Sequence, residues 1–212
     1  MLRITDDLQL IYNKVAVPEF PLAPNKRLEG SLTNITNIVL GISRDAFSLS
    51  LCLERIEHPD NMHARHIIID RNGQVYQAAR LDQPINHLPA NQRNKINNNN
   101  SVAVELVNAG KLFHSESGDA VILRSRGMQG SQRLKISNTN IRPTRRNGVL
   151  QFYEVIYHNQ YVSLCNLVGL LRQKFPNVQV IDCERWLQLH RFALPPDFPR
   201  RQLNQIGTAD TI

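Results

Sequence analysis

The strongest local constraint in the 212-residue sequence is a pair of β-rich runs on either side of an Asn-Gly step. The runs occupy residues 65–70 and 74–79, and the step is Asn72-Gly73. Asn and Gly tolerate the positive φ angles of the tight turn that joins two right-twisted antiparallel strands. The sequence therefore predicts a β-hairpin over residues 65–79, and the rest of the fold has to accommodate this antiparallel pair.

Four other segments have the patterns of core elements. Residues 34–43 and 101–108 are apolar runs of strand length, and the first is predicted to be buried on both faces of a sheet. Residues 159–174 carry apolar side chains at helical spacing and are followed by Pro176, which is typical of an amphipathic helix that ends there. Residues 178–181 predict a further short strand.

Two segments have weaker patterns. Residues 47–56 alternate apolar and polar side chains, which favours a strand, although a helix remains open because the segment follows a turn. Residues 184–192 could form a helical turn.

The length and an ordinary composition, 42% hydrophobic and 20% charged, predict one domain, which we place at residues 31–199. Residues 1–30 contain three prolines and are expected to form an extended arm laid on the domain. Residues 200–212 read as a polar tail that frays. About 45 residues within the domain, at about 110–150, are rich in Gly, Ser, Asn and Arg, and form either an inserted subdomain or a mobile functional loop.

The net charge of +7 indicates a polyanionic partner, and much of the excess lies in this basic insertion. A nucleic acid is an improbable partner, because the insertion offers neither aromatic platforms nor a recognisable binding module. An anionic cell-wall polymer, a membrane surface or a protein partner would satisfy the same charge.

The N-terminus lacks the apolar core of a signal peptide, and no run of 18 apolar residues marks a transmembrane segment. The protein is therefore expected to be cytoplasmic, or exported by a non-classical route. Three cysteines, Cys52, Cys165 and Cys183, are an odd number in apolar or mixed surroundings, which favours reduced thiols over a disulfide framework.

One acidic residue, Glu105, lies inside the apolar run of residues 101–108. Burying an unpaired carboxylate costs several kcal/mol, so Glu105 needs either a positively charged partner, such as Arg65 or Arg80, or a functional role. Three histidines, His66, His87 and His190, stand near predicted strand ends. Their spacing alone is not a zinc signature.

The order of these segments resembles that of the zinc-dependent N-acetylmuramoyl-L-alanine amidases, which share their fold with peptidoglycan recognition proteins. The stretches are HIIIDRNGQVYQ, a loop with His87, NNNNSVAVELVN and the helix QYVSLCNLVGLLRQKFP. The resemblance covers roughly residues 34–198, interrupted by the basic insertion. It implies an α/β (α+β) fold with a central mixed sheet flanked by helices, and a groove that holds a metal and the peptide stem of the cell wall.

The resemblance also implies a set of site residues. Glu105 falls on a glutamate that serves as general base in some members of the family, while Leu40 falls on the histidine that is the first zinc ligand. Cys183 or His190 would be the second ligand, and Asp197 is a weak counterpart of the third. Because a catalytic zinc needs three protein ligands and an open position, this site is expected to be degenerate and without a cofactor.

Three functions follow from these observations. The favoured one is a metal-free, amidase-like protein from a bacterium or phage that binds a peptidoglycan fragment or another anionic ligand. Its groove would be lined by polar groups of His66, His87, Asn86 and Glu105, with Arg65 as a further ligand-binding candidate. The alternative is an active zinc amidase that cleaves the amide between N-acetylmuramic acid and L-alanine. The third is an interaction protein of viral or secretion-system origin that docks through its basic insertion.

Overall fold

The structure is a computed structural model. It describes most of the chain, namely residues 2–12, 15–18, 22, 24–32, 34–43, 48–58, 64–88, 96–114, 121–127, 130–135, 138–146, 148–183 and 194–206. The possible helical turn at residues 184–192 lies outside these ranges, and so does His190.

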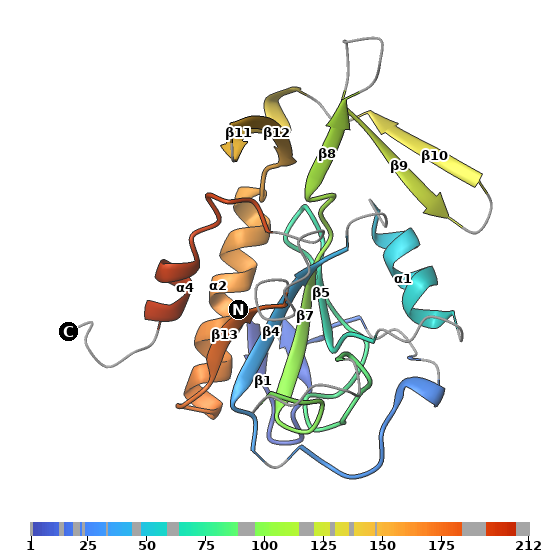
Figure 1. The fold of residues 1–212 in the computed structure, drawn as a ribbon. Coiled ribbons are helices and arrows are strands. Elements are labelled where there is room, and N and C mark those ends of the chain that lie inside the picture. Colours follow the sequence, from blue (N-terminus) through green and yellow to red (C-terminus); the bar gives the residue numbers. More distant parts are fainter. Residues whose placement is uncertain are drawn as a thin grey trace.

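A five-stranded mixed sheet forms the centre of the fold, with strand order β13-β4-β7-β5-β6 (Figure 1). The four parallel strands are β13 (Gln179–Asp182), β4 (Asn37–Ile42), β7 (Ser101–Leu106) and β5 (Ile67–Ile69). The fifth strand, β6 (Val75–Gln77), runs antiparallel to β5. β4 and β7 are buried along nearly their whole length, as their apolar runs predict.

The turn between β5 and β6 confirms the predicted hairpin. Gly73 has a φ of +87°, and a Cβ atom at this position would lie 2.7 Å from the backbone oxygen of Asn159. Asn72 stabilises the same turn, because its side-chain oxygen accepts a hydrogen bond from the Gln74 amide at 2.8 Å. Glycine is therefore required here both by the backbone conformation and by the close approach of α2 (His158–Lys174).

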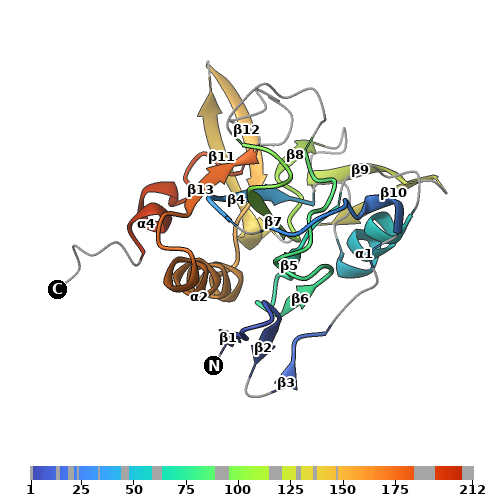
Figure 2. The ribbon, with the colours of Figure 1, turned by 90° about the horizontal axis from the view of Figure 1, so that it is seen from below.

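Helix α2 covers one face of the central sheet (Figure 2). Its buried residues Leu164, Leu167, Val168 and Leu171 pack in one core cluster with alternate residues of β4, β7 and β5. These alternate residues are Ile38, Leu40, Ile42, Val102, Val104, Leu106, Ile67 and Ile69. The helix follows the predicted one closely, because its buried apolar residues recur at helical spacing along the face that packs on the sheet.

Helix α1 (Leu49–Glu57) covers the other face. Its residues Cys52, Leu53 and Ile56 pack with Ile68 of β5 and with Val107. The strand favoured for residues 47–56 is therefore wrong in the described part, which is helical. The alternating apolar residues of this segment also include positions three and four residues apart, which is the spacing of a helix face. Ser48 caps the helix, because its hydroxyl accepts a hydrogen bond from the Leu51 amide at 3.3 Å.

The N-terminal arm folds into a small antiparallel sheet of β1 (Leu2–Ile4), β2 (Leu10–Tyr12) and β3 (Val15–Ala16). Leu10 and Val17 reach the core on the α2 side, so the arm contributes to that core. It continues into a short 3-10 helix, η1 (Pro24–Lys26), and Lys26 is buried. The Lys26 ammonium donates to the backbone oxygens of Ile56 and, at 3.4 Å, of Arg55, which lie in the last turn of α1.

The basic insertion forms a second five-stranded sheet, with order β10-β9-β8-β12-β11 (Figure 1). Its strands are β8 (Lys111–His114), β9 (Val121–Gly127), β10 (Gly130–Lys135), β11 (Ile141–Arg146) and β12 (Val149–Glu154), all paired antiparallel. A 3-10 turn, η2 (Asn138–Asn140), precedes β11. Of the two readings of this segment, the described residues favour an inserted subdomain.

The end of the chain differs from the expected frayed tail. Residues Arg200–Gln205 form helix α4, and Leu203 is fully buried in the core on the α2 side. Arg172 of α2 donates to the backbone oxygens of Leu203, at 2.9 Å, and of Ile206. The buried Leu203, the partly buried Ile206 and these hydrogen bonds anchor a segment that is otherwise polar. In the described part of the chain, no helix is long and apolar enough to cross a membrane.

Candidate functional site

The two residues that the sequence singled out on neighbouring strands, Leu40 and Glu105, lie on opposite faces of the central sheet. In the parallel pairing of β4 with β7, Leu40 is opposite Val104, and Gly41 is opposite Glu105. Leu40 belongs to the core on the α2 side, whereas Glu105 contacts Cys52 of α1. Successive residues of a strand point to opposite faces, so a side chain at position 40 is directed away from Glu105.

Glu105 is 6% exposed, and both of its carboxylate oxygens are engaged. Arg65 donates from Nε to Oε2 at 2.6 Å, and Cys52 donates from Sγ to Oε1 at 3.1 Å. The Arg65 side chain is itself 17% exposed and also donates to the Ala64 backbone oxygen at 2.8 Å. The ion pair that the sequence offered as the alternative role of Glu105 is therefore present.

The charges in this cluster are fixed by its surroundings. Burial alone would lower the pKa of Arg65, but Glu105 and then the thiol of Cys183 raise it above its ordinary value, so the guanidinium stays charged. Burial, followed by the charge of Glu105, raises the pKa of the Cys52 thiol well above its ordinary value. The thiol therefore remains protonated and available as a donor to Glu105.

Gly41 leaves room beside this ion pair. A Cβ atom at Gly41 would lie 3.9 Å from Nη2 of Arg65, so the guanidinium extends over the backbone of β4. On the next strand, Asp182 pairs with Leu40, and Cys183 follows directly at the end of β13. Gly41, Glu105 and Ile68 consequently form one row across the sheet.

Both ring nitrogens of His66 have hydrogen-bond partners inside the protein. It is fully buried, its Nε2 lies 2.9 Å from the Gln83 backbone oxygen, and its Nδ1 accepts a hydrogen bond from the Ala103 amide at 3.0 Å. These partners define the tautomer protonated at Nε2. Burial lowers the pKa of His66 to about 4, so the ring is neutral near pH 7.

His87 and Asn86 lie in the same buried network. The ring of His87 is 3% exposed and contacts the Ile85 backbone oxygen through Nδ1 at 3.0 Å and the Ser101 hydroxyl through Nε2 at 2.9 Å. Asn86 is hydrogen-bonded through its backbone to Lys26, at 2.8 Å, and through Oδ1 to Asn98, at 3.4 Å. These ligand-binding candidates therefore use their polar atoms to join the 85–88 loop to β7 and η1.

The described metal-ligand candidates do not converge. Leu40 is 1% exposed and points into the α2 core, while Asp197 is exposed and forms an ion pair with Arg142 of β11. Cys183 follows directly after the last residue of β13. Among the residues that the structure describes, no three His, Cys, Asp or Glu side chains are grouped so that they could hold a metal ion. The described residues therefore do not fit a catalytic zinc.

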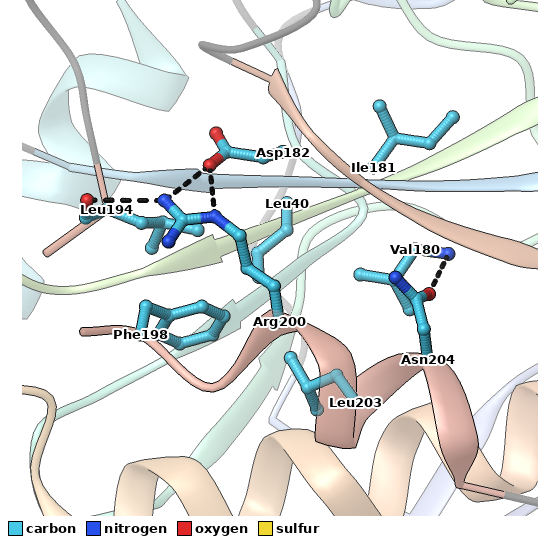
Figure 3. Close-up of a pocket in the computed structure, with 9 residues that line it drawn as sticks. All are labelled: Leu40, Val180, Ile181, Asp182, Leu194, Phe198, Arg200, Leu203 and Asn204. Atoms are coloured by element: carbon cyan, nitrogen blue, oxygen red, sulfur yellow. Dashed lines mark hydrogen bonds and ion pairs between the residues drawn. The ribbon is translucent and has the colours of Figure 1, made fainter. Parts of the chain in front are cut away.

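A pocket of about 380 Å³ lies where β13, β4 and α4 meet (Figure 3). Leu40 forms part of its wall, and the other apolar lining residues are Val180, Ile181, Leu194, Phe198 and Leu203. Its volume is within the usual range of small-molecule sites. The pocket is on the α2 side of the sheet, so it is separated from the Glu105 cluster by the sheet itself.

The polar groups of this pocket come from β13 and α4. Arg200 donates to Oδ2 of Asp182 from Nη2 at 2.7 Å and from Nε at 2.9 Å, and its guanidinium lies 5.7 Å from the centre of the Phe198 ring (Figure 3). The side-chain oxygen of Asn204 accepts a hydrogen bond from the Val180 amide at 3.3 Å. Sequence reasoning missed Asp182, Arg200 and Asn204, since the signal for an ordered segment after residue 199 is weak: two apolar residues, Leu203 and Ile206, in a polar stretch.

The chain has an amidase-like fold. It aligns with AmpD, solved as a selenomethionine derivative, at a TM-score of 0.51 and 14% identity, covering 91% of this chain and 94% of AmpD. Two N-acetylmuramoyl-L-alanine amidases from Clostridium intestinale URNW, the endolysin LysCS and LysC, align at TM-scores of 0.45 with 14% and 11% identity. Both alignments cover 88% of this chain, and they cover 91% of LysCS and 93% of LysC.

No protein-family profile matches the sequence, and no curated protein matches it either. The alignment with AmpD nevertheless confirms, at the level of the fold, the resemblance that the order of motifs predicted: a mixed sheet flanked by helices.

Proposed function

We propose that this protein is an N-acetylmuramoyl-L-alanine amidase-like protein that binds a peptidoglycan fragment without cleaving it. The observation that carries the proposal is the buried ion pair of Glu105 with Arg65, at 2.6 Å. A general base has to accept a proton from the attacking water, and it must lie within hydrogen-bond reach of that water. With one oxygen bonded to a guanidinium and the other to the Cys52 thiol, Glu105 is held in a structural role.

The arrangement of the metal-ligand candidates supports the same proposal. Leu40 has no donor atom and faces the α2 core, and Asp197 is paired with Arg142. A hydrolytic zinc site needs three protein ligands around one open position. We therefore derive no hydrolytic step for this chain, and binding is the function that the geometry supports best.

The pocket beside Leu40 is the candidate site for the ligand. Its apolar wall of Leu40, Phe198 and Leu203 fits small aliphatic groups, such as the methyl groups of a lactyl ether and of an alanine residue. The Asn204 side chain lies at the rim and supplies an amide that can bond to a peptide group. Because Arg200 is paired with Asp182, the pocket is expected to select the uncharged part of the ligand.

Calorimetry with N-acetylmuramoyl-L-alanyl-D-isoglutamine tests this proposal directly. We expect binding that is unchanged by a chelator, and no release of dipeptide in mass spectrometry of the same samples after incubation with zinc. Leu40→Trp should fill the pocket and weaken binding, whereas Val162→Trp, at an exposed site on α2, should leave binding unchanged.

Two results would overturn the proposal. Zinc-dependent release of the dipeptide would establish the active amidase instead. Absence of binding, or binding that Leu40→Trp and Val162→Trp affect equally, would rule out the pocket as the ligand site.

A second candidate function is docking on a protein partner through the hairpin of β11 and β12. Val149 and Leu150 at its tip are 59% and 52% exposed, and the exposed Arg145 is paired with Leu150. Apolar side chains flanked by arginine suit an acidic partner surface. Exchanging Val149 and Leu150 for serine should remove a partner that co-purifies from the source cell, while muropeptide binding is retained. An unchanged set of co-purifying proteins would eliminate this candidate.

A further inference from the structure

We infer that the guanidinium of Arg65 takes the place of a metal cation opposite Glu105, so that the ion pair itself excludes a metal from this face of the sheet. The inference deepens the proposed function, since it rests on the protein being metal-free and names the group responsible. It concerns the row of Gly41 and Glu105 with Cys183 beside it, and does not depend on the pocket near Leu40.

The side chain of Arg65 lies between Glu105 and Gly41. Arg65 precedes β5, and its side chain reaches Glu105 on the neighbouring strand β7, with Nε 2.6 Å from Oε2. Its Nη2 lies 3.9 Å from the place where a side chain at Gly41 would begin. A coordinating side chain at position 41 would therefore extend into the volume that the guanidinium now fills. Glycine at this position and arginine at position 65 are complementary in shape.

The negative charge of Glu105 also limits which groups can occupy this place. A carboxylate that is 6% exposed requires a compensating positive charge, and either a divalent cation or a guanidinium can supply it. The two cannot share the site, because like charges a few ångströms apart in a poorly solvated environment repel strongly. Cys52 engages the second carboxylate oxygen of Glu105, so neither oxygen is directed at a vacant position.

Cys183 is a described thiol that follows the last residue of β13 at this end of the sheet. It follows Asp182, whose partner on β4 is Leu40, the residue before Gly41. Removing the guanidinium and adding an imidazole at position 41 would bring together one thiolate, one imidazole and one carboxylate, which is a sufficient donor set for zinc or cobalt.

Cobalt(II) titration of the double variant Arg65→Ser with Gly41→His tests the inference. We expect a cobalt complex with thiolate absorption bands, which disappear when Cys183→Ser is added. The matched control is Arg65→Ser with Leu40→His, which places the same imidazole on the opposite face and should give no such complex. Gly41→His alone, with the guanidinium retained, should bind no better than the wild type.

Three outcomes overturn the inference. The first is a cobalt complex in the wild type or in Gly41→His alone, because the guanidinium would then not exclude the metal. The second is equal binding by the Leu40→His control. The third is absence of binding by a double variant whose circular dichroism is native. None of these outcomes involves the muropeptide, so the proposed binding function can fail while this inference stands.

A thermodynamic cycle keeps the inference testable if the double variant does not fold. Arg65→Met leaves the Glu105 carboxylate buried without its partner, and should lower the melting temperature by about 6–20 °C. Adding Glu105→Gln should recover most of this loss, because the uncompensated charge is removed as well. If the losses in melting temperature of the two single variants simply add in the double variant, Arg65 acts through packing alone and the inference is overturned.

Discussion

Arg71 and Glu154 form a two-pronged ion pair that joins the central sheet to the inserted sheet. Nε of Arg71 donates to Oε1 of Glu154 at 2.7 Å, and Nη2 donates to Oε2 at 3.0 Å. Arg71 lies in the turn between β5 and β6, whereas Glu154 ends β12 and is 1% exposed. Tyr157 adds a hydrogen bond from its hydroxyl to Oε1 at 3.1 Å. The insertion is therefore attached to the domain by a buried charge.

Glu154→Ala should be severely destabilising, because it removes one member of a buried pair and leaves Arg71 without its carboxylate. We expect a loss of about 3–5 kcal/mol in the free energy of unfolding, measured by urea denaturation. Glu54→Ala, at an exposed position on α1, is the control and should change little. Equal effects of the two variants would show that the Arg71 pair does not hold the insertion.

The ion pair of Arg200 and Asp182 should contribute more to stability than the ion pair of Arg142 and Asp197. The Asp182 side chain is 9% exposed, while the two partners of the second pair are 57% and 43% exposed. We expect Arg200→Ala to cost about 2 kcal/mol and Arg142→Ala less than about 1 kcal/mol in thermal unfolding. The reverse order would mean that α4 is not held to β13 by Arg200.

The neutral His66 makes stability depend on pH. Its pKa is lowered from 6.5 to about 4 by burial, so between these values the unfolded chain binds a proton that the folded protein does not. The contribution is therefore complete above about pH 6.5 and is lost as the pH falls towards 4. The full difference corresponds to about 3 kcal/mol.

Denaturation of the wild type and of His66→Asn at pH 4.5 and pH 7 measures this contribution. Asparagine does not titrate, so the variant should lose less stability on acidification than the wild type, although it starts from a lower value. The same loss in both proteins would show that His66 is not the group responsible.

Gly73 and Gly148 offer a matched pair of glycines with positive φ, at +87° and +77°. A Cβ atom at Gly148 meets nothing within 4 Å, whereas one at Gly73 would meet the Asn159 backbone oxygen at 2.7 Å. Gly148→Ala should therefore cost only the conformational strain, about 1–2 kcal/mol, and Gly73→Ala should cost clearly more. Chemical denaturation of both variants measures the difference, and equal losses would show that α2 can move away from the turn.

The local patterns predicted those elements whose residues specify them without help from distant parts of the chain. Asn72-Gly73 specifies the hairpin turn, and the apolar spacing in residues 159–174 specifies α2. Residues 49–57 were harder to predict, because the apolar positions of a short amphipathic segment fit both the alternation of a strand and the spacing of a helix. The segment is a helix because this conformation buries Cys52, Leu53 and Ile56 together against the sheet.

The candidate site depended on information that local patterns lack. Matching Leu40 to a ligand position used the order of residues, but which face Leu40 takes relative to Glu105 is set by the register of β4 against β7. Pairing of Glu105 with Arg65 brings together residues 40 positions apart, and sequence alone left Arg65 and Arg80 as equal partners. In the structure, Arg80 pairs with Asp82 instead.

The most direct test of a metal-free centre is the zinc content of the purified, tag-free protein after incubation with excess zinc and dialysis. The same elemental analysis on Cys183→Ser and His190→Ala identifies any ligand. We predict that the wild type retains far less than one equivalent of zinc per chain, and that neither variant lowers this amount. Near-stoichiometric zinc that falls in either variant would contradict the account, because a metal site would then exist despite the ion pair of Arg65 and Glu105.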